Sequence, residues 1–216
     1  MGTVEAWANA KGYAITRTRF YLGEYLPALD SFDGLVVVGG TMSVYEEVKY
    51  SWMSGEKAFI KKAIAADKAV LGLCLGAQLI SEAMGGRVTK NPQKEIGWFP
   101  VSLTEEAKSS AFFSTLPEQL MAFQWHGDTF SIPPGARCLA SSEACLNQAF
   151  ELGRAIGVQF HPESSRNSIE SLLDHCGSQA EGPYVQNACD IRAGYGHLSE
   201  LSRIMVQLLD RLFYIE

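Results

Sequence analysis

The sequence predicts an α/β fold in which a mostly parallel central sheet is flanked by helices. Two apolar runs, residues 34–40 and 69–73, have the length and continuity of strands buried on both faces. Segments with helical periodicity alternate with these runs, as in chains wound around a sheet. The 216 residues are 47% apolar and 19% charged, which is enough to form a substantial core. No linker or repeat divides the chain, so we expect one domain over residues 1–216.

The first half of the chain predicts alternating helices and strands. A helix over residues 4–11 is expected to end at the glycine that follows it. Interleaved β-branched residues predict a strand over 13–18. We expect 34–40 to be a central strand, because it is apolar throughout and bounded by glycines. Residues 54–66 place apolar side chains among lysines and acids, which predicts an amphipathic surface helix with Ser54 as its N-cap.

The second half begins with the same alternation and then changes character. A buried strand over 69–73 leads into a short helix over 77–84, which two glycines end. Shorter apolar runs separated by turn residues then predict a more antiparallel stretch. The remaining predicted elements are strands over 97–104, 120–125, 136–141, 144–151 and 154–160, and helices over 167–176 and 197–213.

Charge and composition exclude several classes of partner. The net charge is −6 and there is no long basic run, so we expect neither a nucleic-acid partner nor a membrane-surface patch. The N-terminus lacks the basic-then-apolar order of a signal peptide and no window approaches a membrane span, which predicts a soluble, cytoplasmic protein. Five scattered cysteines predict neither a disulfide framework nor a zinc knuckle. No motif requires a cofactor.

The segment Gly72-Leu73-Cys74-Leu75-Gly76 carries the clearest chemical signal. It has the form G-x-C-x-G where a buried strand meets a helix, the thiol counterpart of the G-x-S-x-G nucleophile elbow. A nucleophile held on such a tight turn needs small neighbours two residues away. The start of the helix would also favour the thiolate over the thiol. Taken alone, the pattern is equally consistent with a buried structural cysteine.

A histidine and a carboxylate at the end of another predicted strand strengthen the catalytic interpretation. In Val158-Gln159-Phe160-His161-Pro162-Glu163, His161 leaves the strand at its carboxyl end, where open α/β sheets place their sites. Glu163 can point to the same side and orient the imidazole, while Pro162 stiffens the link. A lone histidine here would be an ordinary polar strand end. Together with Cys74, the two residues predict a nucleophile, a base and its orienting group.

An oxyanion formed by thiolate attack on a carbonyl needs N–H donors. The N–H of Leu75, which follows the nucleophile, is the expected first donor. Gly39-Gly40 lies in the loop after a neighbouring strand and has the backbone freedom to turn a second N–H inward, so we assign Gly40 as the second donor. An ordinary glycine turn is the alternative for this loop.

Three motifs in order, V-V-G-G-T-M-S, G-L-C-L-G-A-Q and V-Q-F-H-P-E, give the sequence its family resemblance. The chain resembles the class I (triad) glutamine amidotransferases, and in particular stand-alone proteins similar to the glutaminase domain of GMP synthase. The likeness runs from about residue 12 to residue 163 and more loosely to the C-terminus. It implies a flavodoxin-like fold. Family members usually begin with an apolar strand that has no counterpart here, so we expect either that the chain begins late and lacks this first strand or that another segment fills its place in the sheet.

The resemblance implies roles for individual residues. Cys74 would attack the side-chain amide of glutamine, release ammonia and form a γ-glutamyl thioester that water hydrolyses. His161 would transfer the protons and Glu163 would orient its imidazole. The implied substrate contacts are Gly39, Gln78 and Gly127, although Gln78 could equally be a helix-surface residue. Trp125 departs from the family pattern, in which a small polar residue is commoner, and this puts the shape of the pocket in question.

Two versions of this enzyme, and one non-enzyme, remain open. The chain could supply ammonia to a separate synthetase subunit, since it has no P-loop of its own, or it could be a free-standing γ-glutamyl hydrolase or peptidase acting on a γ-glutamyl compound. A regulatory protein without turnover is the third alternative. His126 and Asp128 could suggest a metal site, but no third ligand of suitable spacing accompanies them, so we expect no metal. The segment from Glu95 to Trp98 either borders the pocket or is a turn that leads into a strand.

Overall fold

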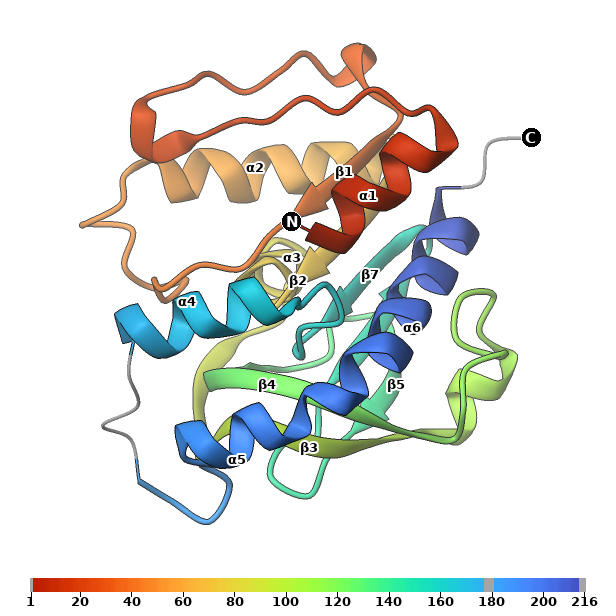
Figure 1. The fold of residues 1–216 in the computed structure, drawn as a ribbon. Helices are drawn as coiled ribbons and strands as arrows, with labels where there is room; N and C mark the ends of the chain where they lie inside the picture. The colour runs from red at the N-terminus through yellow and green to blue at the C-terminus, as the bar shows by residue number, and fades with distance from the viewer. Residues whose placement is uncertain (1, 177–180, 214–216) are drawn as a thin grey trace.

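The computed structural model describes residues 2–176 and 181–213, and within them one sheet of seven strands lies between two sets of helices (Figure 1). The strand order is β1-β2-β7-β6-β5-β3-β4. The strands are β1 (Gly34–Val37), β2 (Ala69–Leu73), β3 (Val88–Leu103), β4 (Gln119–Phe130), β5 (Arg137–Ser141), β6 (Ala149–Leu152) and β7 (Ala155–Val158). The helices are α1 (Gly2–Lys11), α2 (Trp52–Ala65), α3 (Leu75–Ala83), α4 (Arg166–Cys176), α5 (Ala188–Ala193) and α6 (Leu198–Leu212).

The α/β fold class is confirmed, and the sheet is mixed. Strands β1, β2 and β7 are parallel to one another, whereas β7, β6, β5, β3 and β4 pair antiparallel in that order. The predicted antiparallel stretch therefore extends the parallel part on one side. The long β3–β4 hairpin curls this half of the sheet (Figure 1).

Side-chain alternation along β2 divides the core into two clusters, one on each face of the sheet. Leu71 and Leu73 pack with α1 and α6, while Val70 faces the other way and packs with α2 and α3. All three side chains are fully buried. An uninterrupted apolar run is what a strand covered by helices on both faces requires.

Two expectations about the N-terminal third are wrong. Residues 13–18 form no strand; Tyr13 and Ile15 instead pack against the core beside α1 and α6. Strand β1 is an edge strand and ends at Val37, whereas residues 34–40 were expected to be central. A continuous apolar run indicates that both faces of a strand are buried. It does not indicate whether another strand pairs with each of its edges. In the described residues, no segment pairs with the outer edge of β1.

Some of the other element boundaries agree with those predicted from the sequence, and others differ from them. Strand β2 has the expected limits, and α1 ends at Lys11, directly before Gly12, which has a φ of 76°. Helix α2 begins earlier than expected, with Ser51 rather than Ser54 at the N-cap position. Helix α5 was not expected, since six residues are too few to establish a period. No helix among the described residues is long and apolar enough to cross a bilayer.

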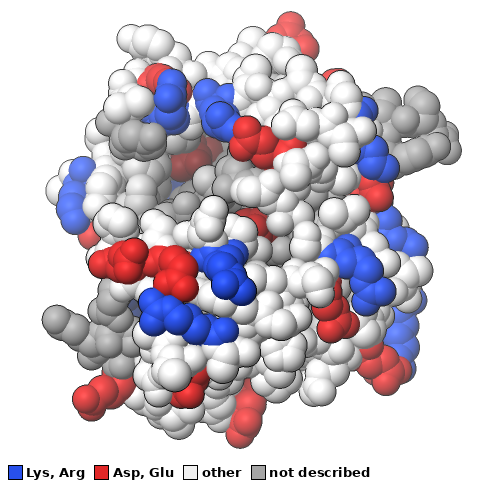
Figure 2. Space-filling model, viewed as in Figure 1, with Lys and Arg blue, Asp and Glu red and all other residues white. Residues whose placement is uncertain are grey.

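Acidic and basic side chains are interspersed over the surface. On the face shown in Figure 2, described Lys and Arg side chains lie beside Asp and Glu side chains rather than gathering in an extended area of one sign. Several of them form ion pairs, such as that between Arg192 and Glu170. Exposed pairs of this kind contribute little to stability individually.

We expect Gly76→Ala to lower the free energy of unfolding by about 3 kcal/mol, because overpacking against backbone cannot be relieved by a rotamer change. A Cβ at residue 76 would lie 2.0 Å from the carbonyl oxygen of Val37. Gly55→Ala is the matched control, since this α2 residue has open space around its Cβ position and should gain roughly 0.5–1 kcal/mol. Denaturant unfolding measures both changes. Equal stability of the two variants would contradict the close α3–β1 contact.

Candidate active site

Cys74 occupies a strained turn between β2 and α3. Its φ of 51° and ψ of −107° lie outside the regions that a residue with a side chain ordinarily adopts. Such a conformation costs on the order of 1–3 kcal/mol and persists only where the surroundings enforce it. A Cβ on Gly72 would lie 2.6 Å from the backbone of Gly76, so both neighbours must be small. The turn has the form expected for an elbow, and it leaves the sulfur beside the start of α3.

His161 and Glu163 lie together just after β7. The Nδ1 atom of His161 is 2.8 Å from Oε1 of Glu163, and because a carboxylate oxygen accepts, this nitrogen donates. The backbone N–H of His161 donates to the carbonyl of Phe123 on β4, which fixes the start of the segment. The His161 side chain is 13% exposed, so it keeps an opening to solvent.

The imidazole of His161 also faces Cys74. A Cβ placed on Gly39 would lie 3.4 Å from Cε1 of His161 and 3.6 Å from Cβ of Cys74, so the two side chains border the same point. Burial alone would lower the pKa of His161, but the Glu163 carboxylate and the Cys74 sulfur outweigh it and raise this pKa well above its ordinary value. The charge state favoured here is therefore an imidazolium beside the sulfur.

The residues assigned to the oxyanion site are neighbours. Gly40 follows β1, and a Cβ on it would lie 3.0 Å from Cδ2 of Leu75, the first residue of α3. Gly39 lies against Cys74 and His161, as described above. The structure thus places Gly39 beside the nucleophile and Gly40 beside Leu75, although the two glycines come from the loop after β1 and Leu75 from the start of α3.

The other two assigned substrate residues lie differently. Gln78 is buried, and its Nε2 donates to the carbonyl of Asp128 at 3.3 Å and to Oε1 of Gln159 at 3.1 Å. It is therefore not a helix-surface residue, and its amide is turned toward the protein interior. Gly127 lies on β4 under the side chain of Lys94, whose Cγ would be 3.3 Å from an added Cβ. Neither residue borders the sulfur in the way that Gly39 does.

Sequence reasoning missed Gln159 as a neighbour of the nucleophile. Its Nε2 is 3.5 Å from the sulfur of Cys74, and its side chain is fully buried. The backbone carbonyl of Trp125 lies 4.0 Å from the same sulfur. The signal available for Gln159 was its place two residues before His161, since alternate residues of an extended segment share a face.

Asp128 joins the loop after β1 to strand β4. Its Oδ2 accepts from the hydroxyls of Ser43 at 2.8 Å and Tyr45 at 3.1 Å, and its Oδ1 is paired with Nζ of Lys90 at 2.8 Å. Burial acts to raise the pKa of Asp128, but the bonds from Lys90, Ser43 and Tyr45 outweigh it and lower this pKa. Asp128 therefore holds the loop that carries Gly40.

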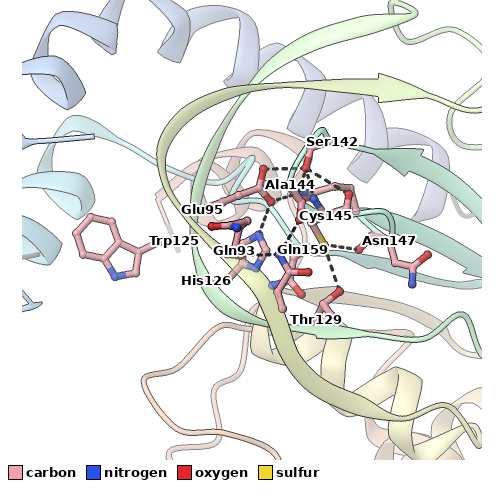
Figure 3. Close-up of polar contacts among 12 residues, drawn as sticks. Gln93, Glu95, Trp125, His126, Thr129, Ser142, Ala144, Cys145, Asn147 and Gln159 are labelled. Atoms are coloured by element: carbon pink, nitrogen blue, oxygen red, sulfur yellow. Dashed lines mark hydrogen bonds and ion pairs between the residues drawn. The ribbon is translucent and has the colours of Figure 1, made fainter. Parts of the chain in front are cut away.

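A second group of chemically active side chains lies inside the curled half of the sheet (Figure 3). Glu95, His126 and Cys145 are all buried, and their potential ligand atoms lie within 4.8 Å of one another. The spacing argument against a metal, which held that no third ligand accompanies His126, is therefore wrong. Glu95 is 31 positions from His126 in the sequence but directly opposite it in the β3–β4 register.

The hydrogen bonds of this group nevertheless do not favour a metal. Glu95 accepts from Ser142 at 2.7 Å and from Gln148 at 2.8 Å, and its carboxyl group also shares a hydrogen bond of 3.0 Å with Nε2 of His126. The other ring nitrogen of His126 donates to the carbonyl of Asp128. Burial raises the pKa of the Cys145 thiol, and a thiol is a poor ligand. We interpret the group as a hydrogen-bonded polar core that fixes β3 against β4.

Comparison with known proteins identifies relatives along most of the chain. Residues 13–175 match the family model described as glutamine amidotransferase class-I. YfeJ, a glutamine amidotransferase-like protein of Salmonella typhimurium, is 35% identical over 209 residues, which cover 92% of this chain and 87% of the relative. A GMP synthase of Thermomicrobium roseum is 31% identical over 154 residues, 67% of this chain but 27% of that enzyme.

Solved structures resemble the fold over nearly its whole length. A glutamine amidotransferase from Thermotoga maritima superposes with a TM-score of 0.86 at 29% identity, covering 98% of this chain and 91% of that one. A glutamine amido transferase from Methylobacillus flagellatus gives a TM-score of 0.90 at 32% identity, covering 98% and 88%.

We expect Asp128→Asn to lower the free energy of unfolding at neutral pH by roughly 1–3 kcal/mol, because the variant loses the charge that Lys90 and the two hydroxyls bind. The folded pKa of Asp128 is lowered, so its contribution is present above the ordinary carboxyl range and is lost as the pH falls through the folded pKa. The difference between wild type and variant should therefore shrink below about pH 4. Denaturant unfolding at several pH values measures it.

The same substitution at Asp30, an exposed residue, controls for the change in net charge. It should alter stability by less than about 0.5 kcal/mol. A difference for Asp128→Asn that stays constant down to acid pH would contradict the role of the carboxylate.

Proposed function

The chain belongs to the class I glutamine amidotransferase family, and on that basis we propose that it hydrolyses the side-chain amide of glutamine with Cys74 as nucleophile, His161 as proton carrier and Glu163 as the group that orients it. One observation carries the proposal. The strained elbow holds the Cys74 sulfur beside an imidazole that is itself bonded to a carboxylate. Nucleophile, base and orienting group in contact are the arrangement that acyl transfer requires.

In the first half-reaction the Cys74 thiolate attacks the amide carbon, a C–S bond forms and the electron pair of the C=O bond moves to oxygen. The N–H groups of Leu75 and Gly40 would stabilise this oxyanion, each worth on the order of 3 kcal/mol. The C–N bond then breaks, and His161 gives its proton to the departing nitrogen, which leaves as ammonia. The product is a γ-glutamyl thioester on Cys74.

In the second half-reaction His161 takes a proton from water, and the hydroxide formed attacks the thioester carbon. The C–S bond breaks and its electron pair returns to sulfur, which releases glutamate and restores the thiolate and imidazolium. Nδ1 of His161 donates to Glu163 throughout, so the other ring nitrogen, Nε2, gives and takes the proton in the two steps.

Gly39 and Gly127 are proposed to contact the amino-acid end of the substrate through their backbones. Gln78 is also proposed as a contact, but only after a rearrangement, since its amide already bonds Asp128 and Gln159. The acceptor of ammonia would be activated by a separate synthetase subunit. The aligned GMP synthase is much longer than the region it shares with this chain.

Trp125 favours a second candidate function, the hydrolysis of a γ-glutamyl compound. It is half-buried on β4 with its carbonyl toward the Cys74 sulfur, where the resemblance leads one to expect a smaller residue. The Trp125 ring packs on Phe123, whose own ring lies against the His161 imidazole, so a larger side chain at this point would alter the wall of the site. Strong cleavage of γ-glutamyl dipeptides with negligible ammonia release from glutamine would establish this second function and reject the first.

We expect Cys74→Ser to abolish release of ammonia and glutamate from glutamine while leaving the fold intact, because serine lacks the acidity of the thiol. A coupled glutamate assay measures turnover, and circular dichroism checks the fold. Cys189→Ser is the matched control, since this cysteine is exposed and distant in sequence from the site. Wild-type turnover in purified Cys74→Ser protein, free of contaminating enzyme, would reject the assignment.

We expect His161→Ala to reduce kcat more than Glu163→Gln does. The first substitution removes the proton carrier, whereas the second removes only the group that orients it. Losses of about 10⁶-fold and 10⁴-fold respectively are the scale set by the corresponding base and orienting residue of a Ser-His-Asp triad. Steady-state kinetics with glutamine measures both. Equal losses, or a larger one for Glu163→Gln, would argue against these roles.

A further inference from the structure

The side chain of Gln159 is aimed at the reacting atom of the proposed site. Its Nε2 lies 3.5 Å from the sulfur of Cys74, within the range of an N–H···S hydrogen bond, and no part of the residue reaches solvent. We propose that Gln159 is a further catalytic residue, which donates a hydrogen bond to the Cys74 sulfur and stabilises its thiolate form. This inference rests on the proposed function, because it assigns a role within the same reaction.

The orientation of the Gln159 amide follows from a chain of hydrogen bonds that begins at the backbone. The carbonyl oxygen of Asp128 can only accept, so the group that Gln78 turns toward it at 3.3 Å must be the NH₂ group. The same NH₂ group lies 3.1 Å from Gln159 and must donate there, which identifies that atom as Oε1. The other end of the Gln159 amide, the end facing the sulfur, is therefore NH₂.

The first acceptor in this series of hydrogen bonds, the backbone carbonyl of Asp128, is itself fixed in place. His126 donates from Nδ1 to the same Asp128 carbonyl at 2.9 Å, and its other ring nitrogen bonds the buried Glu95. Figure 3 shows Gln159 and His126 together in the interior of the curled sheet. The backbone N–H of Gln159 donates to the carbonyl of Gln148, which fixes the main chain as well. Both ends of the Gln159 side chain are thus constrained before any substrate binds.

The hydrogen bond from Gln159 differs from the interaction of the sulfur with His161. His161, with Glu163 bonded to it, is a charged group beside the sulfur. His161 loses a proton in the first half-reaction and regains one in the second, so its charge changes during turnover. The amide of Gln159 does not titrate, so its hydrogen bond to the sulfur is available both when the thiolate attacks and when the C–S bond breaks. The carbonyl of Trp125 can accept only from the thiol form.

Gln159→Met tests the proposal, because it removes the donor while keeping an unbranched side chain of similar length. The ultraviolet absorbance of the thiolate is followed against pH, and the same titration of a protein that also carries Cys74→Ser is subtracted. We expect the midpoint of the Cys74 titration to move upward by about one pH unit. Alkylation by iodoacetamide at neutral pH should slow by only about threefold, because a less acidic thiol gives a more nucleophilic thiolate.

Gln148→Met is the matched control, since Gln148 is also fully buried and also donates from its amide, but to Glu95 rather than to sulfur. It should leave the Cys74 titration where it is in the wild type, even if the fold is less stable. Gln78→Met provides a second test, because it frees the Gln159 amide to rotate and should move the midpoint upward by a smaller amount. If Gln159→Met does not fold, an unchanged midpoint in Gln78→Met overturns the proposal.

The outcomes separate this inference from the proposed function. The titration and the alkylation use no glutamine, so an unshifted midpoint in Gln159→Met, or an equal shift in Gln148→Met, overturns the role of Gln159 while leaving glutamine hydrolysis untouched. Absence of ammonia release from the wild type would reject the proposed function even where the midpoint moves as expected.

Discussion

The close approach of backbone to backbone between β1, β2 and α3 is the contact on which the arrangement of the site depends. Gly76 lies against the carbonyl of Val37, and Gly72 lies against Gly76, with no space for a side chain at either position. This contact forces the chain to reverse between them, and Cys74 takes the strained conformation that results. The core clusters above and below β2 supply the stability that holds the strain.

Polar groups connect the site to the curled half of the sheet through one residue. The carboxylate of Asp128 binds the loop that follows β1. The backbone carbonyl of the same residue accepts hydrogen bonds from the side chains of Gln78 and His126. The loop that carries Gly40, the helix that begins at Leu75 and the β3–β4 hairpin are thus positioned from a common point. Burial strengthens these hydrogen bonds and raises the free-energy cost of leaving a polar atom without a partner. The network therefore constrains all three elements together.

The sequence was sufficient to predict those features that depend on neighbouring residues. Strand β2, the turn at Cys74 and the proximity of His161 to Glu163 each follow from a pattern within a few positions. Features that depend on pairing between distant segments could not be predicted in this way. The edge position of β1 is one, because an apolar run is the same whether or not a strand lies beside it. The contact of Glu95 with His126 is another, since it is set by the register of a hairpin that contains an irregularity.

The edge position of β1 also affects how the protein meets other chains. A row of backbone amide and carbonyl groups on an outermost strand is a template on which a foreign strand can add. Here the row is short, because β1 has four residues and the chain then turns away at Gly39 and Gly40. Because β1 is so short, an added strand could form only a few backbone hydrogen bonds with it. The same turn places the glycines directly beyond this row, so any chain that did add there would lie next to the proposed catalytic centre.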